Sequence, residues 1–191
     1  LSTDQKENLD EIQHAGRHLL ELINDISNIS KIEAGIVDIN IKTEFLSNIV
    51  DTSINRLMPL AKKSNIEILP YTIQDSLQVQ SDPLRLHQVL INLLSNAIKY
   101  NSENGTVEIL CQNLKNGFIR LGIKDTGTGI DETEQLTLFK PFNRLSHGKE
   151  IEGTGLGLVI SSRFMELMNG TIELDSKKGQ GSTFWITIPT A

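Results

Sequence analysis

The predicted strands of this chain come in adjacent pairs, and this arrangement limits the folds that it can adopt. Residues 106–126 read as two strands on either side of Asn116-Gly117, a dipeptide that is typical of hairpin turns. Residues 171–176 and 182–189 form a second pair with alternating apolar side chains. Because neighbouring strands pair directly, with few strand–helix–strand units, we expect a mixed α/β sandwich with helices on one face of the sheet.

The first 33 residues predict one long helix with an apolar seam. Its apolar or small side chains are three and four residues apart, at Leu9, Ile12, Gly16, Leu19, Ile23 and Ile26. Leu22 and Ile29 widen the seam to a stripe that suits a helical bundle, and Gly35 ends the helix. We expect the partner helices to lie outside this chain. Residues 1–35 would then belong to a bundle domain, and residues 36–191 to the α/β domain.

Periodicity and turn residues predict the remaining elements. Further helices are expected over residues 46–64, 82–100 and 156–168, strands over 36–45, 66–71 and 77–79, and an irregular glycine-rich stretch over 126–154.

Composition excludes several functional classes. The net charge of −6 argues against a nucleic-acid-binding protein, which needs a basic surface. The sequence contains no long uncharged apolar run, so it predicts no membrane-spanning helix, and its first residues show no signal-peptide pattern. Cys111 is the single cysteine, so we expect neither a disulfide nor a cysteine metal cluster within the chain. These features favour a cytoplasmic protein.

The helix predicted near residues 82–101 carries polar side chains beside its apolar face. Asn92, Asn96 and Lys99 fall within a narrow arc at 100° per residue. Asparagine is a poor helix former, so both amides need partners, either in neighbouring loops or in a bound ligand. Two asparagines in line with a lysine favour the ligand, because amide oxygens suit magnesium and lysine suits phosphate. His87, close to this face, is interpreted as a solvated surface histidine.

The sequence GTGLG at 153–157 is a second candidate for ligand binding. It lacks the spacing of a dinucleotide fold, and no Gly-Lys-Ser/Thr follows as in a P-loop. Its glycines let the backbone approach a ligand, and the helix that follows offers free N–H groups to an anion. A mobile surface loop is an equally good interpretation of these glycines alone.

Two further segments have both a structural and a functional interpretation. Asp125 ends a predicted strand before Gly127 and Gly129, where its carboxylate either forms an Asx turn or accepts a hydrogen bond from an amine such as that of adenine. Residues 138–145 place two phenylalanines in a polar loop, as a local cluster or as anchors of a movable lid. Arg144 either reaches a terminal phosphate or is an ordinary surface arginine.

Taken in order, these segments resemble the sensor histidine kinases of two-component systems. LRLHQVLINLLSNAIKY, DTGTGI, LFKPFNR and GTGLGL are similar to the N, G1, F and G2 boxes of that family. HLLELINDISNISKIEAG resembles the second helix of its dimerisation and phosphotransfer domain. The resemblance implies a Bergerat-type ATP-binding fold, with ATP and Mg²⁺ as cofactors.

The resemblance also implies roles for single residues. Asn96 would bind magnesium with help from Asn92, and Lys99 and Arg144 would contact phosphate as further catalytic residues. The residues expected around the adenosine are Tyr100, Asp125, Gly127, Gly129, Ile130 and, through water, Thr183. The residues expected around the phosphates are Gly153, Thr154, Gly155, Leu156 and Gly157.

The chain departs from the family at the phosphoacceptor. These kinases transfer the γ-phosphate to a histidine in a His-Glu-x-x-Thr/Asn pattern on the first bundle helix, and then to an aspartate of a response-regulator receiver domain. His14 and His18 lie on the segment similar to the second helix, and neither precedes a glutamate. We therefore expect a fragment that binds ATP without autophosphorylation, from a protein that forms a homodimer through its bundle.

Three other functions stay open at this point. One is a Bergerat-fold ATPase that gates a conformational change, as in type II topoisomerases, mismatch-repair ATPases and chaperones. Another is a serine kinase that acts on anti-sigma antagonists, which the long first helix disfavours. The third is a dimerisation module whose nucleotide site no longer binds.

Overall fold

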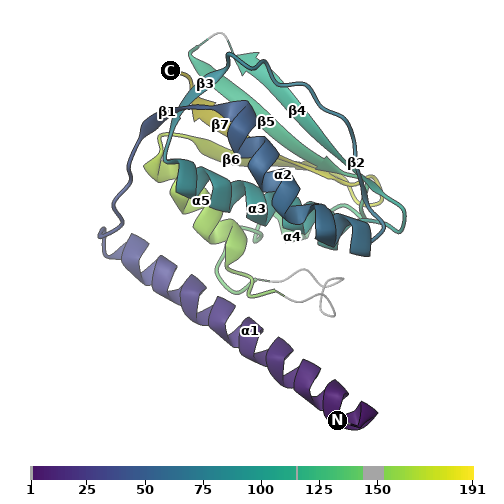
Figure 1. Ribbon diagram of the computed structural model, residues 1–191. Coiled ribbons are helices and arrows are strands. Elements are labelled where there is room, and N and C mark those ends of the chain that lie inside the picture. Colours follow the sequence, from purple (N-terminus) through teal and green to yellow (C-terminus); the bar gives the residue numbers. More distant parts are fainter. Residues whose placement is uncertain (1, 115, 144–152) are drawn as a thin grey trace.

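A five-stranded mixed sheet forms the centre of the α/β domain (Figure 1). The computed structural model describes residues 2–114, 116–143 and 153–191. The sheet has the order β2-β4-β5-β7-β6, with bounds Glu67–Ile68 (β2), Thr106–Leu114 (β4), Phe118–Asp125 (β5), Thr171–Ser176 (β6) and Ser182–Pro189 (β7). Only β2 and β4 pair in parallel, and the other neighbours are antiparallel. The expected mixed α/β class and both hairpins are confirmed.

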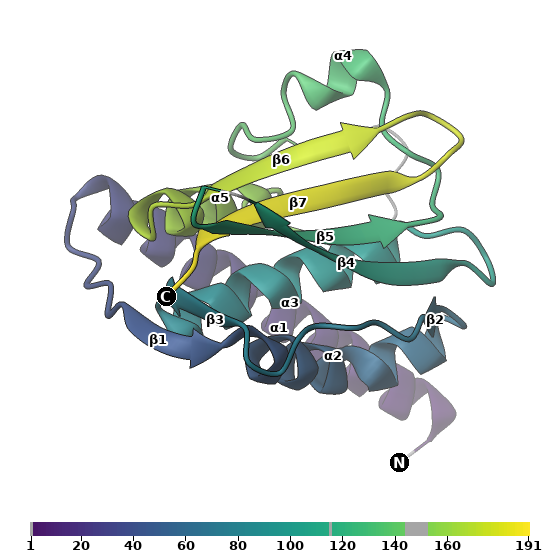
Figure 2. The same ribbon diagram turned by 90° about the horizontal axis from the view of Figure 1, so that it is seen from above.

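Three helices cover one face of this sheet, as the sequence predicts (Figure 2). They are α2 (Leu46–Lys63), α3 (Pro83–Lys99) and α5 (Gly157–Leu167). Asp82 caps α3, since its carboxylate accepts hydrogen bonds from the backbone N–H groups of Leu84 and Arg85. None of the helices in the described part of the chain is long and apolar enough to cross a membrane.

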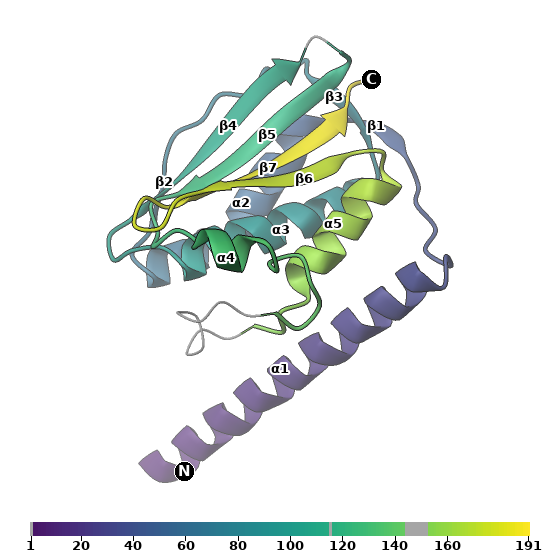
Figure 3. The ribbon, with the colours of Figure 1, turned by 180° about the vertical axis from the view of Figure 1, so that it is seen from behind.

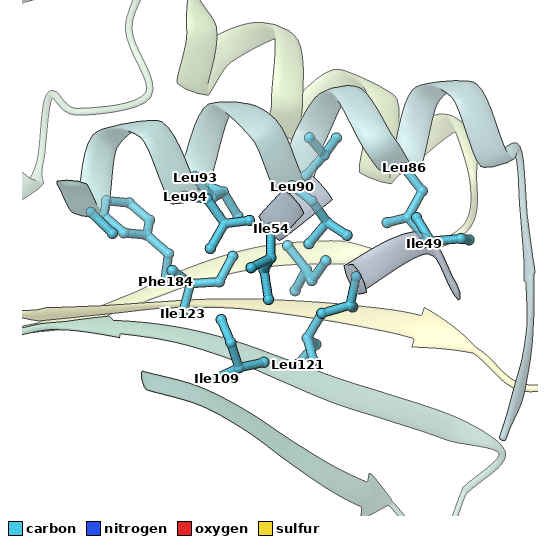
Figure 4. Packing of buried hydrophobic residues seen from close by; sticks show 14 of the residues in the cluster. Ile49, Ile54, Leu86, Leu90, Leu93, Leu94, Ile109, Leu121, Ile123 and Phe184 are labelled. Atoms are coloured by element: carbon cyan, nitrogen blue, oxygen red, sulfur yellow. The ribbon is translucent and has the colours of Figure 1, made fainter. Parts of the chain in front are cut away.

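The core lies between the helices and the sheet. Leu86, Leu90, Leu93 and Leu94 of α3 are fully buried and point toward side chains of the strands and α2 (Figure 4). Each buried leucine contributes roughly 1.5–3 kcal/mol to stability. Because this apolar face fixes the rotation of α3, the polar arc that carries Asn92 and Asn96 lies at the edge of the core.

The first helix, α1 (Thr3–Glu33), lies on the side of α5 that is away from the sheet (Figures 1 and 3). Ile29 and Ile32 pack against the core cluster, so the C-terminal end of α1 is attached to the domain. Further toward the N-terminus, the predicted seam is exposed, including Leu9, Ile12, Leu19, Ile23 and Ile26. Gly35 ends the helix with φ of +66°, as expected for a glycine after the C-cap.

Several predicted boundaries are wrong. The strand expected over 36–45 is only β1 (Lys42–Phe45), because its partner β3 (Gln78–Ser81) ends where Asp82 begins to cap α3. The Asp82 carboxylate also accepts a hydrogen bond from the Asn40 backbone, which ends the pairing. The strand expected over 66–71 has only two residues, and the short helix α4 (Glu132–Gln135) lies within the stretch expected to be irregular.

His87 is not the solvated surface residue that the sequence indicated. It is half-buried between α3 and α2, and its Nδ1 lies 2.8 Å from the hydroxyl of the buried Ser53. The Ser53 hydroxyl also lies 2.7 Å from the Ile49 carbonyl oxygen, and when it donates to that oxygen it accepts from a protonated Nδ1 of His87. Burial, with a contribution from Arg56, lowers the pKa of His87.

Candidate functional site

A cavity of about 500 Å³ lies between α1, α3 and α5 and the ends of β5 and β7. This volume is in the range of sites for small molecules and cofactors. The residues that the sequence singled out and that line this cavity are Asn92, Asn96, Lys99, Tyr100, Asp125, Gly129, Ile130, Gly153, Thr154, Gly155 and Gly157. Segments that are distant in the sequence therefore meet at a single site.

Three of the predicted site residues do not line the cavity, and the placement of a fourth is not described. Arg144 lies outside the described residues. Gly127 and Leu156 do not line the cavity, but their backbone N–H groups hold residues that do. The Gly127 N–H donates to Asp125, and the Leu156 N–H donates to the Thr154 hydroxyl. Thr183 does not line the cavity, whereas its neighbours Ser182 and Phe184 do. Side chains alternate along a strand, so Thr183 faces the other side of the sheet.

Asp125 is the buried acid of the site. Its Oδ1 accepts hydrogen bonds from the backbone N–H of Gly127 at 2.8 Å and of Ser182 at 3.2 Å. Burial raises the pKa of Asp125, and these two hydrogen bonds oppose the rise. The first bond is the predicted Asx turn, and it uses only one carboxylate oxygen. The second oxygen can still accept a hydrogen bond from a ligand amine, so the two interpretations of Asp125 are compatible.

The two asparagines of α3 differ in their surroundings. The Asn92 amide nitrogen donates to the Ser161 hydroxyl of α5 at 2.9 Å, so Asn92 also joins two helices. Asn96 is half-buried in the cavity wall, and no described residue forms a hydrogen bond with its side chain. Its amide is therefore available to a ligand. In the described part of the chain, no group of three or more His, Cys, Asp or Glu gathers as in a metal site.

Two glycines of the site meet a strict backbone requirement. Gly129 has φ of +65°, and a Cβ there would collide with the Lys177 carbonyl. Gly155 has φ of +71°, and a Cβ would lie 3.0 Å from the Asn143 carbonyl oxygen. Both positions need glycine because other residues rarely adopt this region.

Among the cavity residues that sequence reasoning missed, two groups are instructive. Ser182 and Phe184 could have been found from the alternation of β7, which places both on the face opposite Thr183. The second group comes from α1 and consists of Glu21, Asn24, Asp25 and Asn28. Their spacing of three, four and seven residues marks one helix face, but nothing local indicates what that face contacts.

This fold, with a strand-end acid, helix asparagines and a glycine loop around one cavity, defines an ATP-binding domain. The model of the histidine kinase-, DNA gyrase B- and HSP90-like ATPase family matches residues 81–191, so the chain belongs to that family.

The relatives of this chain include sensor histidine kinases. The circadian input-output histidine kinase CikA of Synechococcus elongatus is 40% identical over 193 residues, which cover 99% of this chain and 26% of CikA. The crystal structure of full-length ShkA in complex with AMPPNP has a TM-score of 0.82 at 27% identity, and covers 100% of this chain and 40% of ShkA. ThkA, solved in complex with the response regulator protein TrrA, shares the fold, with a TM-score of 0.70 at 24% identity over 91% of this chain and 49% of ThkA. This chain thus spans well under half of CikA and ShkA.

Proposed function

We propose that this chain is the ATP-binding kinase core of a sensor histidine kinase. It would hold Mg-ATP and present the γ-phosphate to a histidine on a helix outside this sequence, from which an aspartate of a response regulator would receive it. The observation that carries the proposal is the convergence of Asn96, Asp125 and the loop of Gly153–Gly157 on one cavity. Homology to sensor histidine kinases along almost the whole chain supports it.

The two ends of the cavity fit the two ends of ATP. Asp125, Tyr100, Gly129 and Ile130 would form the adenosine end, where the second carboxylate oxygen of Asp125 accepts from the adenine amine. This pattern of one acceptor beside apolar and glycine walls selects a base that has an exocyclic amine.

The phosphate end would combine Asn96, Asn92 and Lys99 with the N-terminus of α5. Phosphoryl transfer needs positioning and neutralisation of charge more than covalent catalysis, and these groups supply both. Amide oxygens of Asn96 and Asn92 fit Mg²⁺, which usually keeps several waters and phosphate oxygens in its own shell. A bound Mg²⁺ would offset the phosphate charge. Arg144 would add a further positive charge at the γ-phosphate.

The intact protein would have further parts. We propose that residues 1–35 belong to a dimerisation and phosphotransfer bundle and residues 36–191 to the catalytic domain. The exposed seam of α1, from Leu9 to Ile26, is a surface suited to a homodimer and to the missing helix. A receiver domain is the proposed acceptor of the phosphoryl group, and the cytoplasm, which holds ATP and receiver domains, is the proposed location.

A labelling experiment tests the kinase assignment. The chain is incubated with Mg²⁺ and ATP labelled in the γ-phosphate, alone and with a polypeptide that carries a complete two-helix bundle with a His-Glu-x-x-Thr/Asn motif from a close relative. We expect acid-labile label on the added polypeptide and none on the chain alone. Label on His14 or His18 would contradict the proposed role of α1. Nucleotide hydrolysis without any transfer would favour an ATPase instead.

A further inference from the structure

One face of α1 forms part of the wall of the nucleotide cavity. Glu21, Asn24, Asp25 and Asn28 all line it. At 100° per residue these four side chains fall within an arc of about 100°. The exposed seam that includes Ile12 and Ile23 lies on the opposite side of the helix. The helix thus turns a polar face to the nucleotide site and keeps its apolar seam for other contacts.

A hydrogen bond joins this polar face to the glycine loop. The Thr154 hydroxyl donates to Asp25 Oδ2 at 2.7 Å, across 129 positions of sequence. The same hydroxyl oxygen accepts from the Leu156 backbone N–H at 3.2 Å. The Thr154 hydroxyl thus donates to Asp25 and, through a lone pair of its oxygen, accepts from Leu156. A bond to a carboxylate is roughly twice as strong as a bond between neutral groups.

The two hydrogen bonds act on the segment that leads into α5. Gly153, Gly155 and Gly157 alternate along it, and all three line the cavity. Glycines lose more conformational entropy on ordering than other residues do, so a free loop of this kind binds weakly. A contact that orders the loop before the ligand arrives removes part of that cost.

Asp25 lies near the part of α1 that packs against the α/β domain. Ile29 and Ile32, one and two turns further along α1, pack against the core of the α/β domain. Asp25 is therefore close to the attached end of α1, whereas residues nearer the N-terminus are far from that end. A change in the docking of α1 would therefore alter this hydrogen bond to Thr154.

We propose that Asp25 is a positioning residue of the nucleotide site, which orders the glycine loop through Thr154. This proposal rests on the proposed function, since the ligand of the site is taken to be ATP. Coupling between two sites is reciprocal. Docking of α1 strengthens nucleotide binding, and bound nucleotide strengthens the docking of α1 by the same factor.

Calorimetric titration with Mg-AMPPNP tests the proposal. Asp25→Ala removes the hydrogen bond between α1 and the loop, and Thr154→Val removes this bond and the one from Leu156. Asp25→Ala should weaken binding about 3- to 10-fold, and Thr154→Val at least as much. The double variant should be no weaker than Thr154→Val alone, because Thr154→Val already removes the bond to Asp25. Asp25→Asn keeps a neutral acceptor and Thr154→Ser keeps a donor, so both should stay within about threefold of the unaltered chain. Glu11→Ala, which removes an exposed carboxylate of α1 outside the cavity, should have no effect.

Hydrogen–deuterium exchange provides a second readout that a merely structural role would not change. AMPPNP should slow the exchange of residues 20–33 in the unaltered chain and in Glu11→Ala, and much less in Asp25→Ala. Unchanged affinity in Asp25→Ala would overturn the proposal. Tighter binding in both Asp25→Ala and Asp25→Asn would also overturn it, since the carboxylate would then act by repelling phosphate. No binding by the folded unaltered chain would instead overturn the proposed function, and this inference with it.

Discussion

The amide nitrogen of Asn92 lies 2.9 Å from the Ser161 hydroxyl, and this hydrogen bond joins α3 to α5 beside the nucleotide cavity. The Asn92 oxygen faces the first residue of α5, because a Cβ built on Gly157 would collide with that oxygen. One asparagine thus sets the distance between the helix that carries Asn96 and the glycine loop. The contact explains why α5 begins with a glycine.

Gly157→Ala should destabilise the fold. The new methyl group has to displace the Asn92 amide and break its bond to Ser161, at a cost of about 1–3 kcal/mol. Gly16→Ala is the matched control, since nothing lies within 4 Å of a Cβ at that helical position. It should stabilise the helix by about 0.5–1 kcal/mol. Chemical denaturation gives the free energy of unfolding of both variants. Equal changes in this free energy would contradict the packing described for Asn92.

Asp125→Asn should weaken adenine-nucleotide binding while the fold is kept. The amide oxygen of asparagine can still accept from Gly127 and Ser182, but an NH₂ group replaces the oxygen proposed to face the adenine amine. The loss of a hydrogen bond to a charged group predicts about 10- to 150-fold lower affinity. Asp175→Asn makes the same change on an exposed strand position. If it lowers affinity as much as Asp125→Asn does, the assignment of the adenosine end is wrong.

His87 makes stability depend on pH. Burial, followed by the charge of Arg56, lowers the pKa of His87 below its ordinary value of 6.5. The unfolded chain therefore binds more protons than the folded one in the window between the lowered pKa and 6.5, and stability rises with pH there. His87→Asn keeps a donor toward Ser53 but does not titrate. The free energy of unfolding of the unaltered chain should fall relative to this variant as pH drops below 6.5, and a constant difference would contradict the burial of His87.

The apolar residues of α1 and α3 should differ sharply in their effect on stability. Leu93 is fully buried between α3 and the sheet, so Leu93→Ala should cost about 2–5 kcal/mol. Ile12 is 67% exposed on α1, and Ile12→Ala should change the free energy of unfolding by less than about 0.5 kcal/mol. Thermal unfolding of dilute samples compares the stabilities of the two variants. A large effect of Ile12→Ala would mean that the seam of α1 is covered in solution.

The parts of the site that were predicted from sequence have local signals. Helical periodicity places Asn92, Asn96 and Lys99 on one side of α3, and the apolar face of that helix then turns this side to the cavity edge. Asp125 ends a strand before two glycines, and its Asx turn is present as predicted. These positions follow from short segments whose conformation depends little on the rest of the chain.

The parts that were missed depend on distant contacts. The wall formed by α1 rests on the packing of Ile29 and Ile32 and on the bond from Thr154 to Asp25, which no local pattern encodes. The alternation of β7 puts Ser182 on the same face as Phe184, but its position beside Asp125 follows only from the register of β7 with β5. The length of β1 likewise depends on where Asp82 caps α3.

The most direct test of the central claim is calorimetric titration of Mg-AMPPNP into this chain, into Asn96→Ala and into Asn113→Ala, an exposed asparagine on β4. The proposed kinase core should bind the nucleotide with micromolar affinity, Asn96→Ala should bind at least about tenfold more weakly, and Asn113→Ala should bind like the unaltered chain. A folded chain that does not bind, or an Asn96→Ala variant that binds as tightly as the unaltered chain, would contradict the account.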